Sequence, residues 1–184
     1  MAKTNIDIKN ITKENLKILI DKKSIENRVA SIANQINEIY VEKNPIILCV
    51  LNGAFIFYAD LVRHLNIDFE VDFIKLSSYG SSMESSGTIR MIKDVSANIA
   101  GRDVIIVEDI IDTGLTINYL RKRMIDGQSK SVSFVTCLLK DRKKYHFDFK
   151  IDCIGFKIPD KFVIGYGLDL DQRFRGLKNI YTIK

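Results

Sequence analysis

The chain has 184 residues, of which 46% are hydrophobic and 28% are charged. These proportions are ordinary for a globular protein, and the length suits a single domain, residues 1–184, with a sizeable core. No apolar run is long enough to span a membrane, and the N-terminus lacks the apolar core of a signal peptide. The net charge of +5 suits an anionic ligand. A solvated lysine-rich surface is the simpler explanation, and nucleic acid is not an expected partner.

Three cysteines, Cys49, Cys137 and Cys153, stand far apart inside apolar runs. An odd number without a Cys-x-x-Cys pair argues against a disulfide framework and against a zinc site. We therefore expect reduced core residues in a cytoplasmic protein.

The N-terminal third begins with short apolar stretches and then shows a helical pattern. Asn5 to Ile11 and Leu16 to Ile20 are typical of edge strands or extended arms. From about Ser24 to Glu42 the apolar residues recur at helical spacing, and Asp21 is placed to cap that helix. The first all-apolar strand is Ile46 to Leu51, and it leads through Asn52 and Gly53 into a helix over 54–65. A glycine at such a junction predicts close approach of the backbone to a ligand.

A long small-polar segment interrupts the middle of the chain. Phe69 to Leu76 alternates as a strand should, and Thr88 to Ile92 returns as a second strand. Ser77 to Gly87 between them is either a mobile hairpin loop or a lid that closes over substrate and excludes water.

A buried strand followed by carboxylates and a turn is the chemical centre of the sequence. Val104 to Val107 is apolar and β-branched, and the acids Glu108, Asp109 and Asp112 follow it. Residues 113–116 then lead through two threonines and a glycine into a helix. Ligands of open α/β sheets lie beyond the carboxyl ends of the strands, and a phosphate fits at a helix N-terminus. Neighbouring carboxylates beside a phosphate suggest sugar hydroxyls or a magnesium ion as their partners.

The C-terminal part continues the alternation of helix and strand. The helix from Leu115 ends at Gly127, and a strand over 132–139 carries Lys140 at its carboxyl end. A charged loop over 141–149 precedes three short strands, over 151–156, 162–166 and 180–183. This pattern predicts an α/β fold with a doubly wound, mainly parallel sheet flanked by helices. We expect a core over about 45–140 and a small hood made by 141–184 and the N-terminal residues.

Two segments resemble a known family. Residues 107–116, Val-Glu-Asp-Ile-Ile-Asp-Thr-Gly-Leu-Thr, resemble the phosphoribosyl-diphosphate signature of the type I phosphoribosyltransferases, and the spelling is closest to the hypoxanthine-guanine members. Residues 156–169 resemble the purine-binding hood of the same family. Incidental acids in a loop would explain any single piece, but not the whole ten-residue order. A Walker A loop is excluded because no Gly-Lys-Ser/Thr follows the glycine.

The resemblance implies a role for each matched position. It assigns Asp112 as the catalytic base and implies a cis peptide bond in the loop after the first buried strand. The family often has lysine at the position of Asn52, so the charge it would bring to the diphosphate is missing. The implied nucleotide and phosphoribosyl-diphosphate contacts are Glu108, Asp109, Ile110, Asp112, Thr113, Gly114, Leu115 and Thr116. The implied diphosphate contacts are Leu51, Asn52, Gly53 and Arg175, and the implied lid pair is Ser78 and Tyr79. The implied purine contacts are Lys140, Lys161, Phe162, Val163 and Asp169. The implied Mg²⁺ ligands are Glu108, Asp109 and Asp169.

The expected function is purine salvage. The resemblance implies transfer of 5-phosphoribosyl from phosphoribosyl diphosphate to hypoxanthine and guanine, giving IMP or GMP and diphosphate, by a homodimer or homotetramer. A related enzyme for xanthine stays open, and a pyrimidine base fits Lys140 and Phe162 less well. A regulator that keeps the fold and binds RNA or DNA is the alternative from another class, but it would not require both Asp112 and Asp169.

Overall fold

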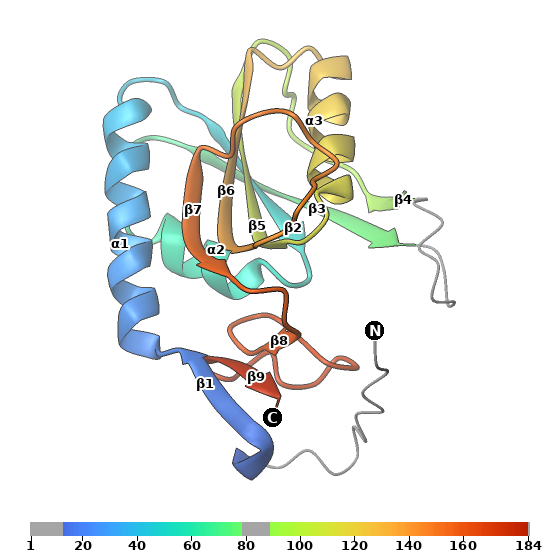
Figure 1. Cartoon of the computed structure of the whole chain (residues 1–184). Coiled ribbons are helices and arrows are strands. Elements are labelled where there is room, and N and C mark those ends of the chain that lie inside the picture. Colours follow the sequence, from blue (N-terminus) through green and yellow to red (C-terminus); the bar gives the residue numbers. More distant parts are fainter. Residues whose placement is uncertain (1–12, 79–88, 184) are drawn as a thin grey trace.

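The computed structural model describes residues 13–78 and 89–183. A six-stranded sheet lies at its centre (Figure 1). The strand order is β4-β3-β2-β5-β6-β7, and only the β3–β4 pair is antiparallel. The predicted doubly wound, mainly parallel sheet is therefore confirmed. Its strands are β2 (Ile46–Leu51), β3 (Glu70–Ser78), β4 (Ile89–Lys93), β5 (Asp103–Ile111), β6 (Ser131–Lys140) and β7 (Cys153–Ile158).

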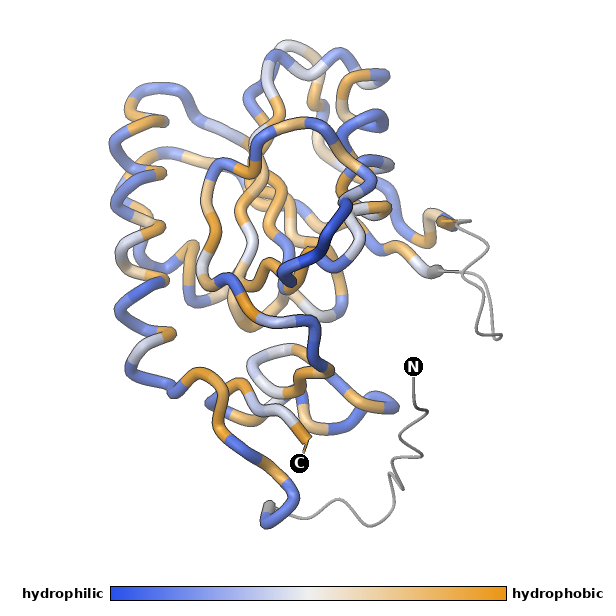
Figure 2. Tube along the Cα trace, in the orientation of Figure 1, coloured by the Kyte–Doolittle hydropathy of each residue, from blue (hydrophilic) through white to orange (hydrophobic). Residues whose placement is uncertain are grey.

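Helices cover both faces of this sheet (Figure 1). Helices α1 (Lys22–Ile39) and α2 (Phe55–Val62) lie on one face, and α3 (Leu115–Asp126) lies on the other. The central strand β2 serves both layers, because Ile47 packs with α1 and α2 while Leu48 packs with α3. Figure 2 shows the hydrophobic residues concentrated along the central strands, where both layers meet the sheet. Within 13–78 and 89–183, no helix is long and apolar enough to cross a membrane.

The ends of the helices and strands follow local chemistry. Asp21 caps α1 by accepting a hydrogen bond from the Ser24 backbone N–H at 3.0 Å, and α3 ends at Gly127, both as predicted. Strand β5 extends beyond the predicted end because it stays paired with β6, with Glu108 opposite Thr136. The two neighbouring acids therefore lie within the strand, not in a loop after it.

A second, antiparallel sheet of three strands forms the hood, which we define as β1 and residues 159–183. Its order is β1-β9-β8, from Leu16–Ile20, Ile180–Ile183 and Val163–Ile164, and a short 3-10 turn over Lys13–Asn15 precedes it. Strand β7 falls within the segment from about residue 141 that we expected in the hood, but it pairs in parallel with β6 and extends the main sheet. The predicted element over 5–11 lies outside the described residues.

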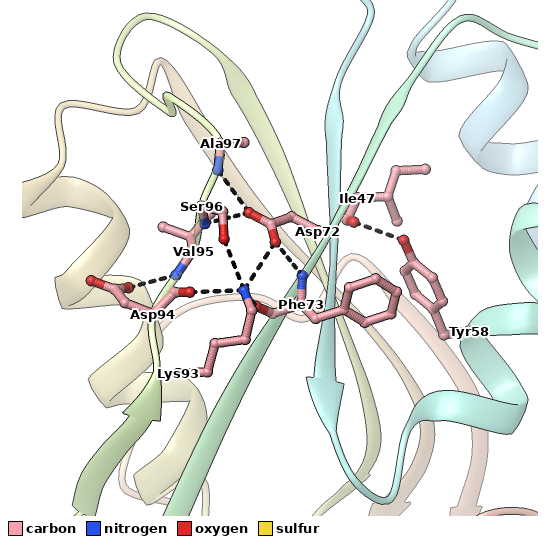
Figure 3. A network of polar contacts seen from close by, with 9 residues as sticks. All are labelled: Ile47, Tyr58, Asp72, Phe73, Lys93, Asp94, Val95, Ser96 and Ala97. Atoms are coloured by element: carbon pink, nitrogen blue, oxygen red, sulfur yellow. Dashed lines mark hydrogen bonds and ion pairs between the residues drawn. The ribbon is translucent and has the colours of Figure 1, made fainter.

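A buried carboxylate secures the edge of the main sheet (Figure 3). Asp72 accepts hydrogen bonds from the backbone N–H groups of Phe73 at 2.7 Å, Ser96 at 2.5 Å and Ala97 at 2.8 Å, and from Lys93 Nζ at 3.2 Å. Burial alone would raise the pKa of this carboxyl, but these donors favour the charged form and lower the pKa below its ordinary value. Asp72 thereby ties the connection between β4 and β5 to the sheet.

The alternating face predicted for β3 points outward in the single chain. The side chains of Val71 and Phe73 are 52% and 37% exposed, whereas Asp72 and Ile74 between and beyond them are buried. The Phe73 ring packs against Tyr58 of α2 with 5.6 Å between ring centroids, so the helix covers only part of this face.

Candidate active site

A cleft of about 230 Å³ lies at the carboxyl ends of the central strands. The ends of β2, β3 and β5 and the start of α3 surround it, which is where ligands of open α/β sheets bind. Its walls are Val50, Leu51, Gly53, Leu76, Ser77, Ile89, Glu108, Asp109, Ile110 and Thr116. A larger hollow of about 480 Å³ beside α1 and α2 contains none of the predicted site residues, so we assign the site to the cleft.

The two acids in the cleft are held close together by consecutive positions in β5. Glu108 is only 5% exposed. Burial and the neighbouring Asp109 raise the pKa of Glu108 well above its ordinary value, and burial raises the pKa of Asp109 to about 6. Arg175 opposes this rise at Asp109, although the Ile110 N–H, which donates to Asp109 Oδ1 at 2.7 Å, opposes it more strongly. The pair therefore suits a ligand that brings hydroxyl donors or positive charge.

The loop after β2 lies between the acids and the hood. Its Leu51–Asn52 peptide bond is cis, as the family resemblance implied. Gly167 of the hood has φ of 99°, and a Cβ built there would overlap the carbonyl oxygen of Gly53. We predicted that the backbone at Gly53 would lie close to a ligand; on the side of its carbonyl group it lies close to Gly167 of the hood. The Asn52 side chain is exposed, where a diphosphate could reach it.

The start of α3 has the features of a phosphate site. Gly114 occupies the position before the helix with φ of 88° and provides no side-chain cap. The backbone N–H groups of the first helical turn therefore remain for an anion, and Thr113, Leu115 and Thr116 are partly exposed around them. His146 in the loop after β6 donates its backbone N–H to the Thr113 carbonyl at 2.8 Å, which holds this turn in place.

The residues predicted to bind the base come from the end of β6 and from the hood, and the Lys140–Asp160 ion pair at 3.6 Å joins the two segments. Lys140 Nζ lies 2.9 Å from Asp112 Oδ2, although the two residues are 28 positions apart. Phe162 is 47% exposed and is therefore not a core residue, while Val163 in β8 is buried and Lys161 is exposed. The structure thus places a lysine, a carboxylate and an exposed aromatic ring at one end of the sheet.

Asp169 and Arg175 form a separate pair within the hood. Asp169 Oδ1 lies 2.9 Å from Arg175 Nη2, and Arg175 Nη1 donates to the Gly167 carbonyl at 2.8 Å. Because Gly167 abuts Gly53, the arginine is anchored next to the loop after β2. Its planar fork of donors suits a phosphate or a carboxylate.

Comparison with known proteins shows the family to which the chain belongs. Residues 16–171 match the phosphoribosyl transferase domain. The chain belongs to this family. It is 41% identical over 168 residues to the hypoxanthine-guanine phosphoribosyltransferase of Bacillus subtilis, covering 91% of this chain and 93% of the relative. It is 39% identical over 168 residues to the hypoxanthine-guanine-xanthine phosphoribosyltransferase of Tritrichomonas foetus, covering 91% of each.

Solved structures of the same family share the fold. A hypoxanthine phosphoribosyltransferase from Staphylococcus aureus superposes with a TM-score of 0.87 at 32% identity, covering 93% of each chain. A hypoxanthine-guanine phosphoribosyltransferase from Bacillus anthracis has a TM-score of 0.85 at 37% identity, covering 91% of this chain and 98% of the other. The chain is thus a phosphoribosyltransferase, an enzyme of glycosyl transfer, built on the type I fold.

The donor set of this phosphoribosyltransferase fits magnesium by its chemistry. Glu108, Asp109 and Asp169 present carboxylate oxygens, which are the ligands that Mg²⁺ prefers, and the raised pKa values of the first two favour a nearby cation. Among the described residues, however, no three acidic, histidine or cysteine side chains converge as a preformed metal cluster. A magnesium ion here would draw most of its ligands from the diphosphate and water, which is common for this ion.

The structure also brings in a residue that the sequence did not single out. Arg142 contacts Asp112 directly, with Nε 2.7 Å from Oδ1. The basic composition of the loop after β6 was visible in the sequence, but the acid that this arginine reaches depends on the fold. Of the predicted lid pair, Ser78 ends β3, and Tyr79 lies outside the described residues.

Proposed function

We propose that this phosphoribosyltransferase serves purine salvage by joining hypoxanthine or guanine to phosphoribosyl diphosphate, which yields IMP or GMP and diphosphate. The observation that carries the proposal is the Lys140–Asp112 pair at 2.9 Å, directly before the turn at Thr113. Lys140 also lies 3.6 Å from Asp160, two residues before the exposed Phe162. A lysine donor and a carboxylate acceptor together match the 6-oxygen and a ring nitrogen of a 6-oxopurine. The names of the matched relatives support the same bases.

The phosphoribosyl end of the substrate occupies the cleft. Backbone N–H groups of residues 113–116 and the two threonine hydroxyls bind the 5′-phosphate at the start of α3. Glu108 and Asp109 accept hydrogen bonds from the ribose hydroxyls and favour the positive charge that develops on the ring in an oxocarbenium-like transition state.

The purine lies between the hood and Lys140. Phe162 stacks on the base, backbone groups around Val163 and the exposed Lys161 flank its edge, and Lys140 donates to the 6-oxygen. The bond between the ribose carbon and the purine nitrogen forms as the bond from that carbon to the diphosphate oxygen breaks. Asp112 takes the proton that the purine ring releases in this step.

The diphosphate leaves toward the loop after β2. Residues 51–53 and Arg175 contact it. Glu108, Asp109 and Asp169 would hold Mg²⁺, which would supply positive charge to stabilise the leaving group. The predicted role of Ser78 and Tyr79 as a lid that excludes water remains part of this proposal, with Tyr79 outside the described residues. We place this reaction in the cytoplasm, which the three free, buried cysteines favour.

The active form is a homodimer or homotetramer. Its support is that the single chain leaves large apolar side chains exposed on α2, β3 and β4, namely Phe55, Val71, Phe73 and Ile92. A matched structure from Trypanosoma cruzi, with a TM-score of 0.83, belongs to work on how the C-terminal region of that hypoxanthine phosphoribosyltransferase affects its oligomeric state. A second copy of this chain is the partner that we expect to cover these side chains.

A spectrophotometric assay tests the proposed function. The enzyme is given phosphoribosyl diphosphate and magnesium with hypoxanthine, guanine, xanthine, adenine or uracil in turn. We expect turnover of hypoxanthine or guanine that stops when a chelator is added. Turnover of adenine or uracil alone, or of no base, would overturn the proposal. Xanthine is included because one matched relative carries it in its name.

A further inference from the structure

Two acids and two bases form a closed ring of charge at the base-binding end of the site. Lys140 Nζ lies 2.9 Å from Asp112 Oδ2 and 3.6 Å from Asp160 Oδ1. Arg142 Nε lies 2.7 Å from Asp112 Oδ1, and the Arg142 guanidinium also pairs with Asp160. Each base therefore contacts both acids.

The backbone that carries Arg142 is fixed at both ends of its loop. Asp141 donates its N–H to the Ile158 carbonyl at 2.8 Å, and the Tyr145 hydroxyl donates to the Lys140 carbonyl at 2.6 Å. Further along, Phe147 packs so closely on the turn over residues 113–116, which we call the phosphate turn, that a Cβ on Gly114 would overlap its ring. The segment crosses from β6 to β7 over the α3 side of the sheet (Figure 1). Because this loop is attached both to Lys140 and to the phosphate turn, the backbone of Arg142 is held in place by the fold.

The ring matters because the proposed reaction needs two of its members for the substrate. Lys140 must turn to the 6-oxygen of the base, and Asp112 must present an oxygen to the proton that leaves the purine. When Lys140 leaves Asp112 Oδ2, that oxygen becomes available. Arg142 meanwhile holds Oδ1, and Asp160 lies within reach of the lysine.

We propose that Arg142, itself held by Asp160, is a positioning residue that keeps the Asp112 carboxylate oriented toward the purine before proton transfer. The proposal rests on the proposed function of Asp112. Arg142 exchanges no proton; the proton passes from the purine ring to Asp112 Oδ2 while the guanidinium stays bonded to Oδ1. Asp160 supplies the counter-charge that lets Lys140 pass from Asp112 to the base without losing an acidic partner.

Steady-state kinetics of substituted enzymes test this role. Arg142→Gln should lower kcat on the order of 10- to 100-fold, because a misplaced base costs turnover, with KM for phosphoribosyl diphosphate changed less than about threefold. Arg142→Lys should recover part of the loss, because lysine keeps the charge but not the fork. Asp160→Asn should lower kcat in the same direction and by less. Lys144→Gln, which removes an exposed charge from the same loop, should leave kcat unchanged. Equal kcat in Arg142→Gln and the parent enzyme would overturn the proposal.

A double-substitution cycle separates positioning from a general structural effect. If Arg142 acts through Asp112, then adding Arg142→Gln to Asp112→Asn should cost no further turnover. The same fold-loss in both backgrounds would mean that Arg142 acts elsewhere, and the proposal would fail. Should Arg142→Gln unfold at the assay temperature, Arg142→Ala with added guanidinium replaces it, and no gain of turnover with guanidinium counts against the role.

The failure of this proposal can be told from failure of the proposed function. Normal turnover in Asp112→Asn would remove Asp112 as the base, and with it the foundation of both proposals. Impaired turnover in Asp112→Asn together with full turnover in Arg142→Gln would remove the positioning role alone.

Discussion

The carboxylate of Asp109 lies where a side chain on Gly53 would have to stand. A Cβ built on Gly53 would overlap Asp109 Oδ2, and on its other side the Gly53 carbonyl touches Gly167. The loop after β2 thus fits between β5 and the hood only because position 53 has no side chain. The acid and the loop form one unit that cannot be altered at Gly53 without moving Asp109.

Gly53→Ala should therefore impair catalysis more than folding. We expect kcat/KM to fall on the order of 100-fold, because the new methyl group displaces Asp109 or the loop from the phosphoribosyl site. Gly176→Ala is the matched control, since a Cβ there would meet nothing within 4 Å. Steady-state assays and thermal melts of both variants check the prediction. A Gly53→Ala enzyme with parental kinetics would show that the loop and the acid move independently.

Asp72→Asn should lower the stability of the fold in a pH-dependent way. We expect a loss of about 2 kcal/mol near neutral pH, because the amide cannot satisfy the three backbone donors and Lys93 as the carboxylate does. The folded-state pKa of Asp72 is below its ordinary value, so its contribution is present above the unfolded-state pKa and is lost as pH falls through the folded-state pKa.

Denaturant unfolding at several pH values measures this difference. The gap between the parent and Asp72→Asn should be constant from pH 7 down to about pH 5 and shrink below about pH 4. The exposed Asp68→Asn is the control and should show little loss at any pH. A gap that widened on acidification would contradict the sign of the pKa shift.

Phe162→Leu should weaken binding of the base without destabilising the fold. The ring is 47% exposed and so contributes little packing, while base–aromatic stacking is worth roughly 1–3 kcal/mol. We expect KM for hypoxanthine to rise about tenfold, with KM for phosphoribosyl diphosphate unchanged. An equal rise in both KM values would argue that Phe162 shapes the whole site and does not stack on the base.

Asn52→Lys should strengthen binding of the diphosphate. Lysine would add positive charge at the exposed tip of the loop after β2, where the parent has a neutral amide. Lys75 lies beside Leu51 in the β2–β3 pairing and is the nearest cation along that ladder, so Lys75→Met should have the opposite effect. Product inhibition by diphosphate, measured at several salt concentrations, should tighten in the first variant with a steeper salt dependence. Unchanged inhibition in both variants would place the diphosphate elsewhere.

Much of the main sheet could be predicted from the sequence because its strands and helix ends depend on residues that are neighbours in the chain. The buried strands over 46–51 and 104–107 read as unbroken apolar runs, and Asp21 and Gly127 mark helix ends through their own chemistry. The turn over residues 113–116, where we propose that the phosphate binds, could be predicted as a turn into a helix for the same reason, since glycine, threonines and a helix start are contiguous there.

Features that join distant segments could not be predicted in this way. The end of β5 depends on its ladder with β6, and the hood depends on β1 pairing with β9 from the other end of the chain. The contact of Arg142 with Asp112 spans 30 positions and arises only once two parallel strands end side by side. The outward face of β3 carries the same alternation as a buried one, so Val71 and Phe73 gave no local sign of their exposure.

The three cysteines all lie in the core layer between the sheet and helices α1 and α2. Burial raises the pKa of the Cys49 thiol to about 12 and also raises that of Cys137, so neither is a reactive thiolate in the folded chain. An alkylating reagent would then react only when this layer separates from the sheet. The layer under α3 contains no thiol, so its opening would not be detected by this labelling. The rate of thiol labelling would therefore measure how often helices α1 and α2 separate from the sheet by local unfolding.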